Sequence, residues 1–235
     1  MTPWSRQNGG LRLPAPRIGI VSSRHRLCAA SRRPLHEASA LLAAQVAAAS
    51  DSGVEFFQVR EPDLDGGALL VLVRALVRAS RDGVRIVVND RADVAAATGA
   101  GLHLKSTSMA VERLRPWLPS ATWISIAVHG VADLSGAVDV DAVVAGTVRD
   151  TPSKAASTPR LGLDGLAQLV ASTTRPVFAI GGLTADDWPG VAAAGAVGLA
   201  AIGWMLPHHG EDPGAAVARA MARLRAVVDG GHAVS

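Results

Sequence analysis

Short runs of Val and Ile alternate with longer segments rich in Ala, Leu and Arg along most of the chain. This alternation is typical of parallel strands covered by helices, because such strands are buried on both faces. Strands are predicted at residues 17–22, 54–60, 85–89, 101–104, 123–128, 142–145, 176–180 and 198–202. Helices are predicted at residues 36–49, 64–80, 91–97, 109–117, 131–138, 163–171, 185–194 and 213–228. The pattern therefore predicts an α/β protein, a single (βα)8 TIM barrel.

We expect the barrel to span residues 17–229, because the 235 residues of the chain match the roughly 250 that one such barrel needs. Residues 1–16 are predicted to form a flexible N-terminal tail, and residues 230–235 a C-terminal tail. The N-terminal segment is rich in Arg, Pro and Gly. It lacks the apolar run of a secretory signal, which supports the prediction of a tail.

The composition of the chain indicates which partners and which location to expect. Apolar residues make up 49% of the chain, but no stretch of 18 or more residues is free of charge and Pro, so we expect no membrane span. Cys28 is the single cysteine and has no disulfide partner, which is typical of the cytoplasm, the expected location. The net charge of +3 is dispersed and aromatic residues make up only 3%, so we expect no nucleic-acid partner. A homo-oligomer is left open.

Polar residues stand where the predicted strands end. The carboxyl ends of parallel strands converge on one rim of a barrel, and that rim carries the active site of barrel enzymes. The polar residues at these ends are Gln58, Arg60, Asn89, Asp90, His103 and His129. Two structural alternatives stay open: Arg60 pairs with a nearby acid, and Asp90 caps the following helix.

Glycines follow the last two strands, at Gly181-Gly182 and at Ile202-Gly203. Glycine lets an anion approach the backbone closely, and the start of a helix offers free N–H groups. Because the loops after strands seven and eight commonly bind phosphate in this fold, we predict a phosphate site there. The alternative is that these residues only form turns.

The loop after the sixth strand contains Thr151, Pro152, Ser153 and Lys154 and runs to Leu161. Loops of this length are usually functional or disordered. Hydroxyl groups and an ammonium on such a loop can cover a phosphate or an anionic transition state. The alternative is an ordinary solvent-exposed loop.

Taken in order, six segments resemble the superfamily of thiamine phosphate synthase and the thiazole tautomerase TenI, over about residues 17–228. The segments are Gln58–Glu61, Val88–Ala95, Gly101–Leu104, Val128–His129, Thr151–Lys154 and Ala179–Gly182. The resemblance implies a role in thiamine biosynthesis, with small phosphorylated thiazole or pyrimidine molecules as ligands.

The synthase branch joins hydroxymethylpyrimidine diphosphate to thiazole phosphate and expels pyrophosphate, with Mg²⁺ on the leaving group. The resemblance implies that Gln58, Arg60 and Asn89 bind the pyrophosphate and that Asp90 binds Mg²⁺. The chain departs from the synthase pattern at three places. Pro62 replaces a lysine, Lys105–Met109 contains no second metal carboxylate, and Ala127 replaces a serine.

The tautomerase branch is more similar to the chain at Leu104–Ser108 and at Val128-His129, although Asn89-Asp90 has the synthase form. Its reaction moves a proton to aromatise a thiazole carboxylate phosphate, which suits a histidine and requires no cofactor. We therefore predict a TenI-like tautomerase. The alternatives are a Mg²⁺-dependent synthase and a barrel that binds ligand without catalysis.

The predicted tautomerase site has two groups of residues. The resemblance and the strand ends together give His129 and Lys154 as catalytic residues. The residues predicted to bind the substrate or its phosphate are Gln58, Arg60, Asn89, His103, Thr151, Ser153, Gly181, Gly182, Ile202 and Gly203.

Overall fold

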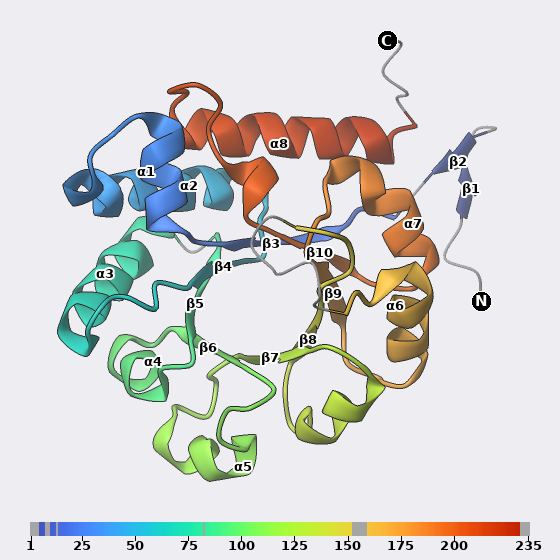
Figure 1. Ribbon diagram of the computed structural model, residues 1–235, viewed down its shortest axis with the longest axis horizontal. Helices are drawn as coiled ribbons and strands as arrows, with labels where there is room; N and C mark the ends of the chain where they lie inside the picture. Colours follow the sequence, from blue (N-terminus) through green and yellow to red (C-terminus); the bar gives the residue numbers. More distant parts are fainter. Residues whose placement is uncertain (1–4, 8–9, 13, 82, 152–158, 231–235) are drawn as a thin grey trace.

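Parallel strands form a closed barrel at the centre of the molecule, and helices surround it (Figure 1). The computed structural model describes residues 5–7, 10–12, 14–81, 83–151 and 159–230. The strand order around the barrel is β10-β3-β4-β5-β6-β7-β8-β9, so eight strands close it, each parallel to both neighbours. The predicted single (βα)8 TIM barrel is confirmed.

The elements of the barrel follow the predicted alternation. The strands are β3 (Arg17–Val21), β4 (Phe56–Val59), β5 (Arg85–Asn89), β6 (Gly101–Leu104), β7 (Ile124–Val128), β8 (Ala142–Gly146), β9 (Val177–Ile180) and β10 (Gly198–Ala201). The α-helices are α1 (Arg24–Ser31), α2 (Ala38–Ser52), α3 (Gly66–Ala79), α4 (Ala92–Thr98), α5 (Val111–Leu114), α6 (Gly162–Ala171), α7 (Trp188–Ala193) and α8 (Pro213–Val228). The 3-10 helices are η1 (Leu35–Glu37), η2 (Arg115–Trp117), η3 (Val131–Gly136), η4 (Ala185–Asp187) and η5 (Gly203–Met205).

Several connecting segments differ from the prediction. Helix α1 is absent from the predicted set, because its arginines interrupt the apolar spacing and only Leu27, Cys28 and Ser31 are buried. The predicted helix at residues 131–138 is the 3-10 helix η3, in a segment where Gly130 and Gly136 disfavour an α-helix. The predicted helices at residues 109–117 and 185–194 are each divided into an α-helix and a 3-10 helix.

Alternate residues of the strands face two separate apolar cores. Phe56, Val87 and Phe178 belong to a small cluster that fills the barrel interior. Ile86 and Val88, on either side of Val87, belong instead to the large cluster between the strands and the helices. This division follows from the two-residue period of a strand and explains why the strands are apolar on both faces.

The barrel interior depends on its aromatic residues. The rings of Phe56 and Phe178 pack edge to face with centroids 5.1 Å apart. A Cβ atom at Gly19 would lie 2.1 Å from the Phe56 ring, so the glycine of β3 makes room for this side chain. Phe56 thus occupies space that the neighbouring strand leaves open.

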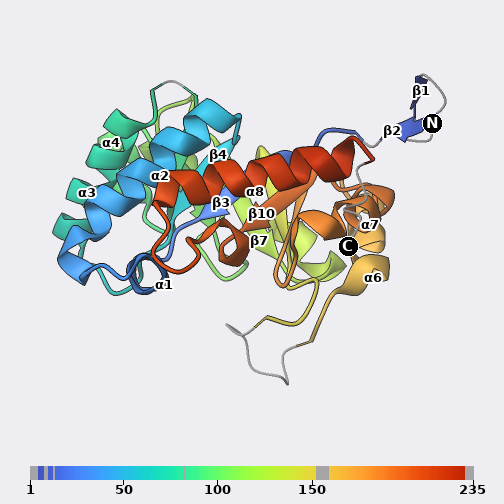
Figure 2. The same ribbon diagram turned by 90° about the horizontal axis from the view of Figure 1, so that it is seen from above.

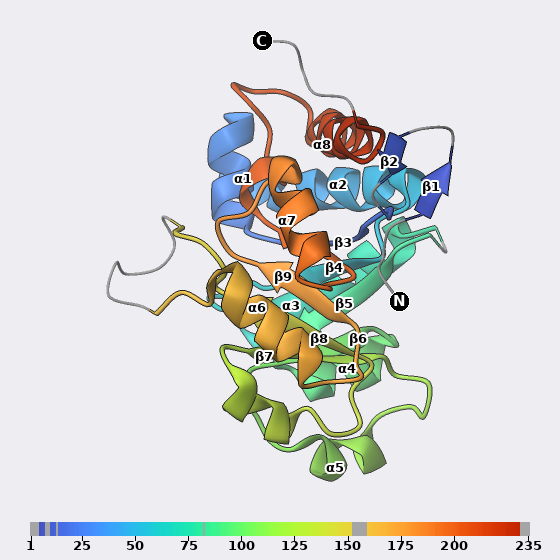
Figure 3. The same ribbon diagram turned by 90° about the vertical axis from the view of Figure 1, so that its right-hand side faces the viewer.

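The N-terminal segment approaches the barrel near α7 and the end of α8, and β1 and β2 project away from the barrel (Figures 1, 2 and 3). Strands β1 (Ser5–Gln7) and β2 (Gly10–Arg12) pair in an antiparallel hairpin within the predicted tail. The indole N–H of the buried Trp188 donates to the Pro14 carbonyl at 2.9 Å. The predicted division into tail and barrel stays a prediction.

Helix α8 lies along α2 on the outside of the barrel (Figure 2). Among the described residues, no helix is long and apolar enough to cross a membrane.

Removal of the Phe56 ring is expected to destabilise the protein. Phe56→Ala should lower the free energy of unfolding by about 3 to 5 kcal/mol, because the rigid barrel cannot close the cavity. Urea denaturation measures the change. Val71→Ala on α3 is the control: Val71 is 69% exposed, so a change within about 0.5 kcal/mol is expected. Equal effects of the two substitutions would contradict the account of the interior.

Candidate active site

The carboxyl ends of β4, β5 and β6 place the predicted polar residues side by side. Asn89 of β5 is in register with His103 of β6, and Val59 of β4 with Val88. The side-chain amide of the buried Gln58 donates to Asn89 Oδ1 at 3.0 Å. This bond fixes the orientation of the Asn89 amide, so its NH₂ group is the half that can donate to a ligand.

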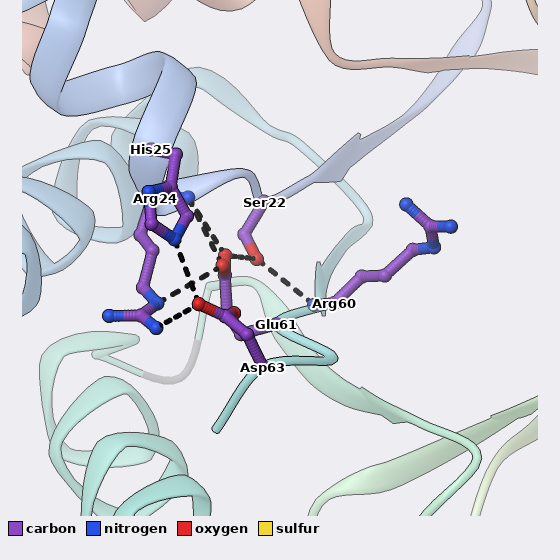
Figure 4. Close-up of polar contacts among 6 residues, drawn as sticks. All are labelled: Ser22, Arg24, His25, Arg60, Glu61 and Asp63. Carbon is purple, nitrogen blue, oxygen red and sulfur yellow. Dashed lines mark hydrogen bonds and ion pairs between the residues drawn. The ribbon is translucent and has the colours of Figure 1, made fainter. Parts of the chain in front are cut away.

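A buried cluster anchors Arg60 at this rim (Figure 4). The backbone N–H of Arg60 donates to Ser22 Oγ at 3.0 Å, and the Ser22 hydroxyl donates to Glu61 at 2.5 Å. The backbone N–H of Arg24 donates to the same carboxylate at 3.0 Å. Burial raises the pKa of Glu61, while the hydrogen bonds from Ser22 and Arg24 act in the opposite direction. These hydrogen bonds thus join the loop after β3 to the loop after β4, next to the backbone of Arg60.

The acids next to Arg60 interact with other groups. Arg24 forms ion pairs with Glu61, at 3.6 Å, and with Asp63, which His25 also contacts at 2.8 Å. Figure 4 shows the Arg60 side chain pointing away from this cluster. Within the described part of the chain Arg60 has no ion pair, so the structural alternative of an Arg60 pair is not seen. Its guanidinium, with five N–H donors, remains available for an anion.

Asp90 lies at the end of β5 with a left-handed backbone (φ 57°), which a non-glycine residue rarely adopts. Its carboxylate accepts a hydrogen bond from the Ser108 hydroxyl and forms an ion pair with the Lys105 ammonium. Burial acts to raise the pKa of Asp90, but the hydrogen bonds from Lys105 and Ser108 outweigh it and lower the pKa. Asp90 is therefore an anion with both of its oxygens engaged.

The residues around Asp90 do not form a site that fits Mg²⁺. This ion is usually held by one or two carboxylates that are free to bind it, together with waters and substrate phosphates. Here one carboxylate is present and an ammonium already neutralises it. Among the described residues, no group of three His, Cys, Asp or Glu side chains could hold a metal ion.

His103 is a buried, neutral histidine. Its Nδ1 lies 2.8 Å from the Ser125 hydroxyl on the next strand, and its side chain is 6% exposed. Burial, followed by the positive charge of Arg60, lowers its pKa to about 4, against a smaller opposite effect of Asp90. At neutral pH His103 therefore acts as a hydrogen-bonding group and carries no charge.

His129 follows β7 and lies at the exposed surface of the rim. Its Nδ1 contacts the Gly146 carbonyl, and its backbone N–H donates to Asp133 at 2.7 Å. Because a carbonyl only accepts, Nδ1 carries the proton in the neutral ring, and Nε2 is the acceptor. Among the described residues no partner of Nε2 is seen, so this nitrogen of the predicted proton-transfer residue can accept a hydrogen bond from a ligand.

Gly181 and Gly182 are needed for packing of the neighbouring loop. Both have positive φ, 101° and 67°. A Cβ at Gly182 would lie 2.2 Å from the Asp150 carbonyl oxygen, and one at Gly181 would lie 2.5 Å from Thr147. These glycines therefore have a structural role, and their predicted contact with phosphate stays a prediction.

The turn after β10 has open space at Gly203. The atom nearest to a Cβ built there is a guanidinium nitrogen of Arg26, at 3.5 Å. Helix α1 thus brings a basic side chain to the predicted phosphate site beside Ile202, which the sequence analysis missed. Thr151 is described, whereas Ser153 and Lys154 lie outside the described residues.

Lys105, Ser108 and Ser125 also lie at the site, although the sequence does not predict them there. Lys105 follows the last residue of β6, so the strand-end rule that selected His103 applies to it equally. Ser125 pairs in register with His103 across β6 and β7. The contact between Ser125 and His103 can be predicted only when the register between β6 and β7 is known.

Comparison with known proteins identifies the family. The family described as thiamine monophosphate synthase (TMP-TENI) matches residues 29–204. The chain therefore belongs to the thiamine monophosphate synthase family. The thiamine-phosphate synthase of Albidiferax ferrireducens is 35% identical over 223 residues, covering 93% of this chain and 94% of that protein. A putative thiamine-phosphate synthase of Geobacter sulfurreducens is 41% identical over 165 residues, covering 68% and 78% respectively.

A solved structure agrees with the fold. Thiamine phosphate pyrophosphorylase from Pyrococcus furiosus superposes with a TM-score of 0.71, covering 92% of this chain and 97% of that one. At 24% identity this likeness concerns the fold alone.

Acid is expected to destabilise the protein through His103. The native pKa is about 4, whereas an ordinary histidine has 6.5, so the unfolded state binds the proton first as the pH falls. This contribution to stability is complete above pH 6.5 and is lost as the pH falls toward 4. The loss should amount to about 3 kcal/mol.

The matched variant His103→Asn separates this effect from that of other acid-sensitive groups. Urea denaturation at pH 7 and pH 4 should show a smaller loss of stability in the variant than in the parent. An equal loss in both proteins, or an NMR titration of His103 near pH 6.5, would contradict the assignment.

Proposed function

We propose that the chain is a thiamine-phosphate synthase, which transfers the hydroxymethylpyrimidine group from its diphosphate to thiazole phosphate. The observation that carries the proposal is the 35% identity with the synthase of Albidiferax ferrireducens over almost the full length of both chains. The matched relatives thus favour the alternative of the sequence analysis over the tautomerase predicted first.

The polar rim supports binding of a diphosphate. The Arg60 guanidinium, the Asn89 NH₂ group and the Lys105 ammonium come from three adjacent strand ends. A guanidinium matches the geometry of phosphate oxygens, and an amide adds a neutral donor. We place the pyrimidine diphosphate over β4, β5 and β6, with Gln58 holding Asn89 in position.

Transfer breaks the bond between the pyrimidine methylene carbon and the diphosphate oxygen, and a new bond forms from that carbon to the thiazole nitrogen. Pyrophosphate leaves with the electron pair of the broken bond. Fixed positive donors stabilise the charge that develops on the leaving oxygens. In this proposal Arg60 supplies the largest part of that stabilisation, because the neighbouring acids are paired with Arg24.

We place the thiazole phosphate on the opposite side of the rim, at Gly181, Gly182, Ile202 and Gly203. Arg26 adds a positive charge there from α1. The loop with Thr151, Ser153 and Lys154 is proposed to cover the substrates, since it follows β8 beside Gly181. In this proposal His103 and His129 hydrogen-bond to the substrates.

A thiazole tautomerase remains the second candidate, and the geometry of His129 favours it. The Gly146 carbonyl fixes Nδ1 as the donor, which leaves Nε2 to accept the proton that aromatisation requires. The third possibility is that this barrel binds its ligand without catalysing a reaction. An assay with the substrates of both reactions separates the three.

Arg60→Ala is expected to lower kcat/KM for thiamine phosphate formation by about 100 to 1,000-fold, because one donor to the developing charge is lost. Formation of thiamine phosphate and pyrophosphate is followed by chromatography. Arg74→Ala, on the exposed face of α3, removes the same charge far from the rim and should leave the rate unchanged.

Two results would contradict the synthase. One is the absence of thiamine phosphate from the parent reaction. Another is rapid tautomerisation of the thiazole carboxylate phosphate that His129→Asn slows by about 100-fold or more. An Arg60→Ala variant as active as the parent would instead contradict the role of Arg60 and leave the synthase standing.

The phosphate position is tested at Gly203, where a side chain can be added without strain. Gly203→Val should weaken binding of thiazole phosphate about tenfold or more, because the valine displaces charged hydrogen bonds. The phosphate-free thiazole alcohol should be affected less. Calorimetry measures both ligands.

Gly67→Val at the start of α3 is the control, since it adds the same bulk outside the barrel. Equal loss of affinity for the phosphate and the alcohol would place the phosphate elsewhere.

A further inference from the structure

Lys105, the residue directly after β6, carries a positive charge at the rim and is not among the predicted site residues. Lys105 is 57% exposed at its side chain, and its ammonium pairs with the 29% exposed carboxylate of Asp90. This inference rests on the proposed function, because it concerns how the diphosphate is bound.

Hydrogen bonds fix the position of both members of the pair. The backbone N–H of Asp90 donates to the His103 carbonyl at 2.8 Å, which joins β5 to β6 beyond the regular ladder. The backbone N–H of Lys105 donates to Ser108 Oγ at 2.9 Å, and the Ser108 backbone N–H donates to the Lys105 carbonyl at 3.0 Å. The Ser108 hydroxyl then donates to Asp90. Lys105 thus starts a closed turn that is tied to the Asp90 carboxylate.

The pair lies beside the proposed diphosphate position. Strands β4, β5 and β6 are neighbours in the barrel, so Arg60, Asp90 and Lys105 follow adjacent strand ends (Figure 1). An unpaired carboxylate there would repel a diphosphate. The Lys105 ammonium neutralises Asp90 and has three N–H donors, of which the carboxylate needs one.

We propose that the Lys105 ammonium, held by Asp90 and Ser108, binds the substrate diphosphate directly and takes the place of a divalent metal ion. The inference follows from the donor set: both oxygens of the single carboxylate are engaged by Ser108 and Lys105, and the ammonium there repels a second cation, whereas the same ammonium can meet phosphate oxygens. Lys105 is thus a substrate-binding residue, and Asp90 and Ser108 are positioning residues.

Binding of inorganic pyrophosphate tests the proposal without turnover. Calorimetry on the full chain in EDTA should show binding to the parent. Lys105→Ala should weaken this metal-free binding by about 10 to 100-fold, as expected for the loss of a charged hydrogen bond. Lys105→Arg should retain most of the affinity, and Arg74→Ala should match the parent.

A second variant gives a readout that does not depend on the ligand. Lys105→Asp places a second carboxylate beside Asp90, so Mn²⁺ should bind to it, as measured by electron paramagnetic resonance. The parent should bind Mn²⁺ at least tenfold more weakly. Circular dichroism shows whether each variant is folded.

The outcomes separate this inference from the proposed function. Pyrophosphate binding to the parent that requires Mg²⁺, or equal metal-free binding by the parent and Lys105→Ala, would overturn the role of Lys105 while leaving the synthase standing. Absence of thiamine phosphate from the parent reaction, whatever the pyrophosphate binding shows, would overturn the proposed function and with it this inference.

Discussion

All strands of the barrel run in the same direction, so every carboxyl end opens on the same rim. Closure is the constraint on which the site depends, because it brings together residues that are far apart in the sequence, such as Arg60 and Gly203. Closure in turn requires an interior filled by a few large side chains, and Gly19 permits it by leaving room for Phe56. The positions of the side chains at the rim therefore depend on the packing of the barrel interior.

The distribution of charge at the rim follows from which acids are already paired. Arg24 of α1 forms ion pairs with Glu61 and Asp63, and Lys105 forms an ion pair with Asp90. Arg60 is therefore left without a neighbouring counterion among the described residues. In the proposed function this arrangement attracts the diphosphate, and the hydrogen bond from the Arg60 backbone to Ser22 holds the residue at the rim. This arrangement links the buried cluster to the proposed binding of diphosphate.

The sequence predicts the barrel well because burial on both faces of parallel strands leaves a strong local pattern. It also places Gln58, Asn89 and His103 correctly at strand ends. It does not predict helix α1, whose arginines hide the short buried stripe. The pairs Asp90–Lys105 and His103–Ser125 depend on strand register and loop closure, which are not local properties of the sequence.

The choice between the two branches of the superfamily is harder to predict from the sequence than the fold is. Pro62, Ala127 and the missing second carboxylate favour a tautomerase when they are read as isolated motifs. The structure gives one of these departures a physical meaning, because Lys105 balances the charge of Asp90 where the second carboxylate is missing. In the proposed synthase, the loss of a metal ligand accompanies a different way of binding the diphosphate.

The most direct test of the account is a crystal structure with thiamine phosphate and pyrophosphate bound together. The account predicts pyrophosphate between Arg60 and Lys105, over the ends of β4 to β6, and the phosphate of thiamine phosphate at Gly182 and Gly203. Pyrophosphate on the glycine side of the rim, or product bound at the opposite end of the barrel, would contradict it.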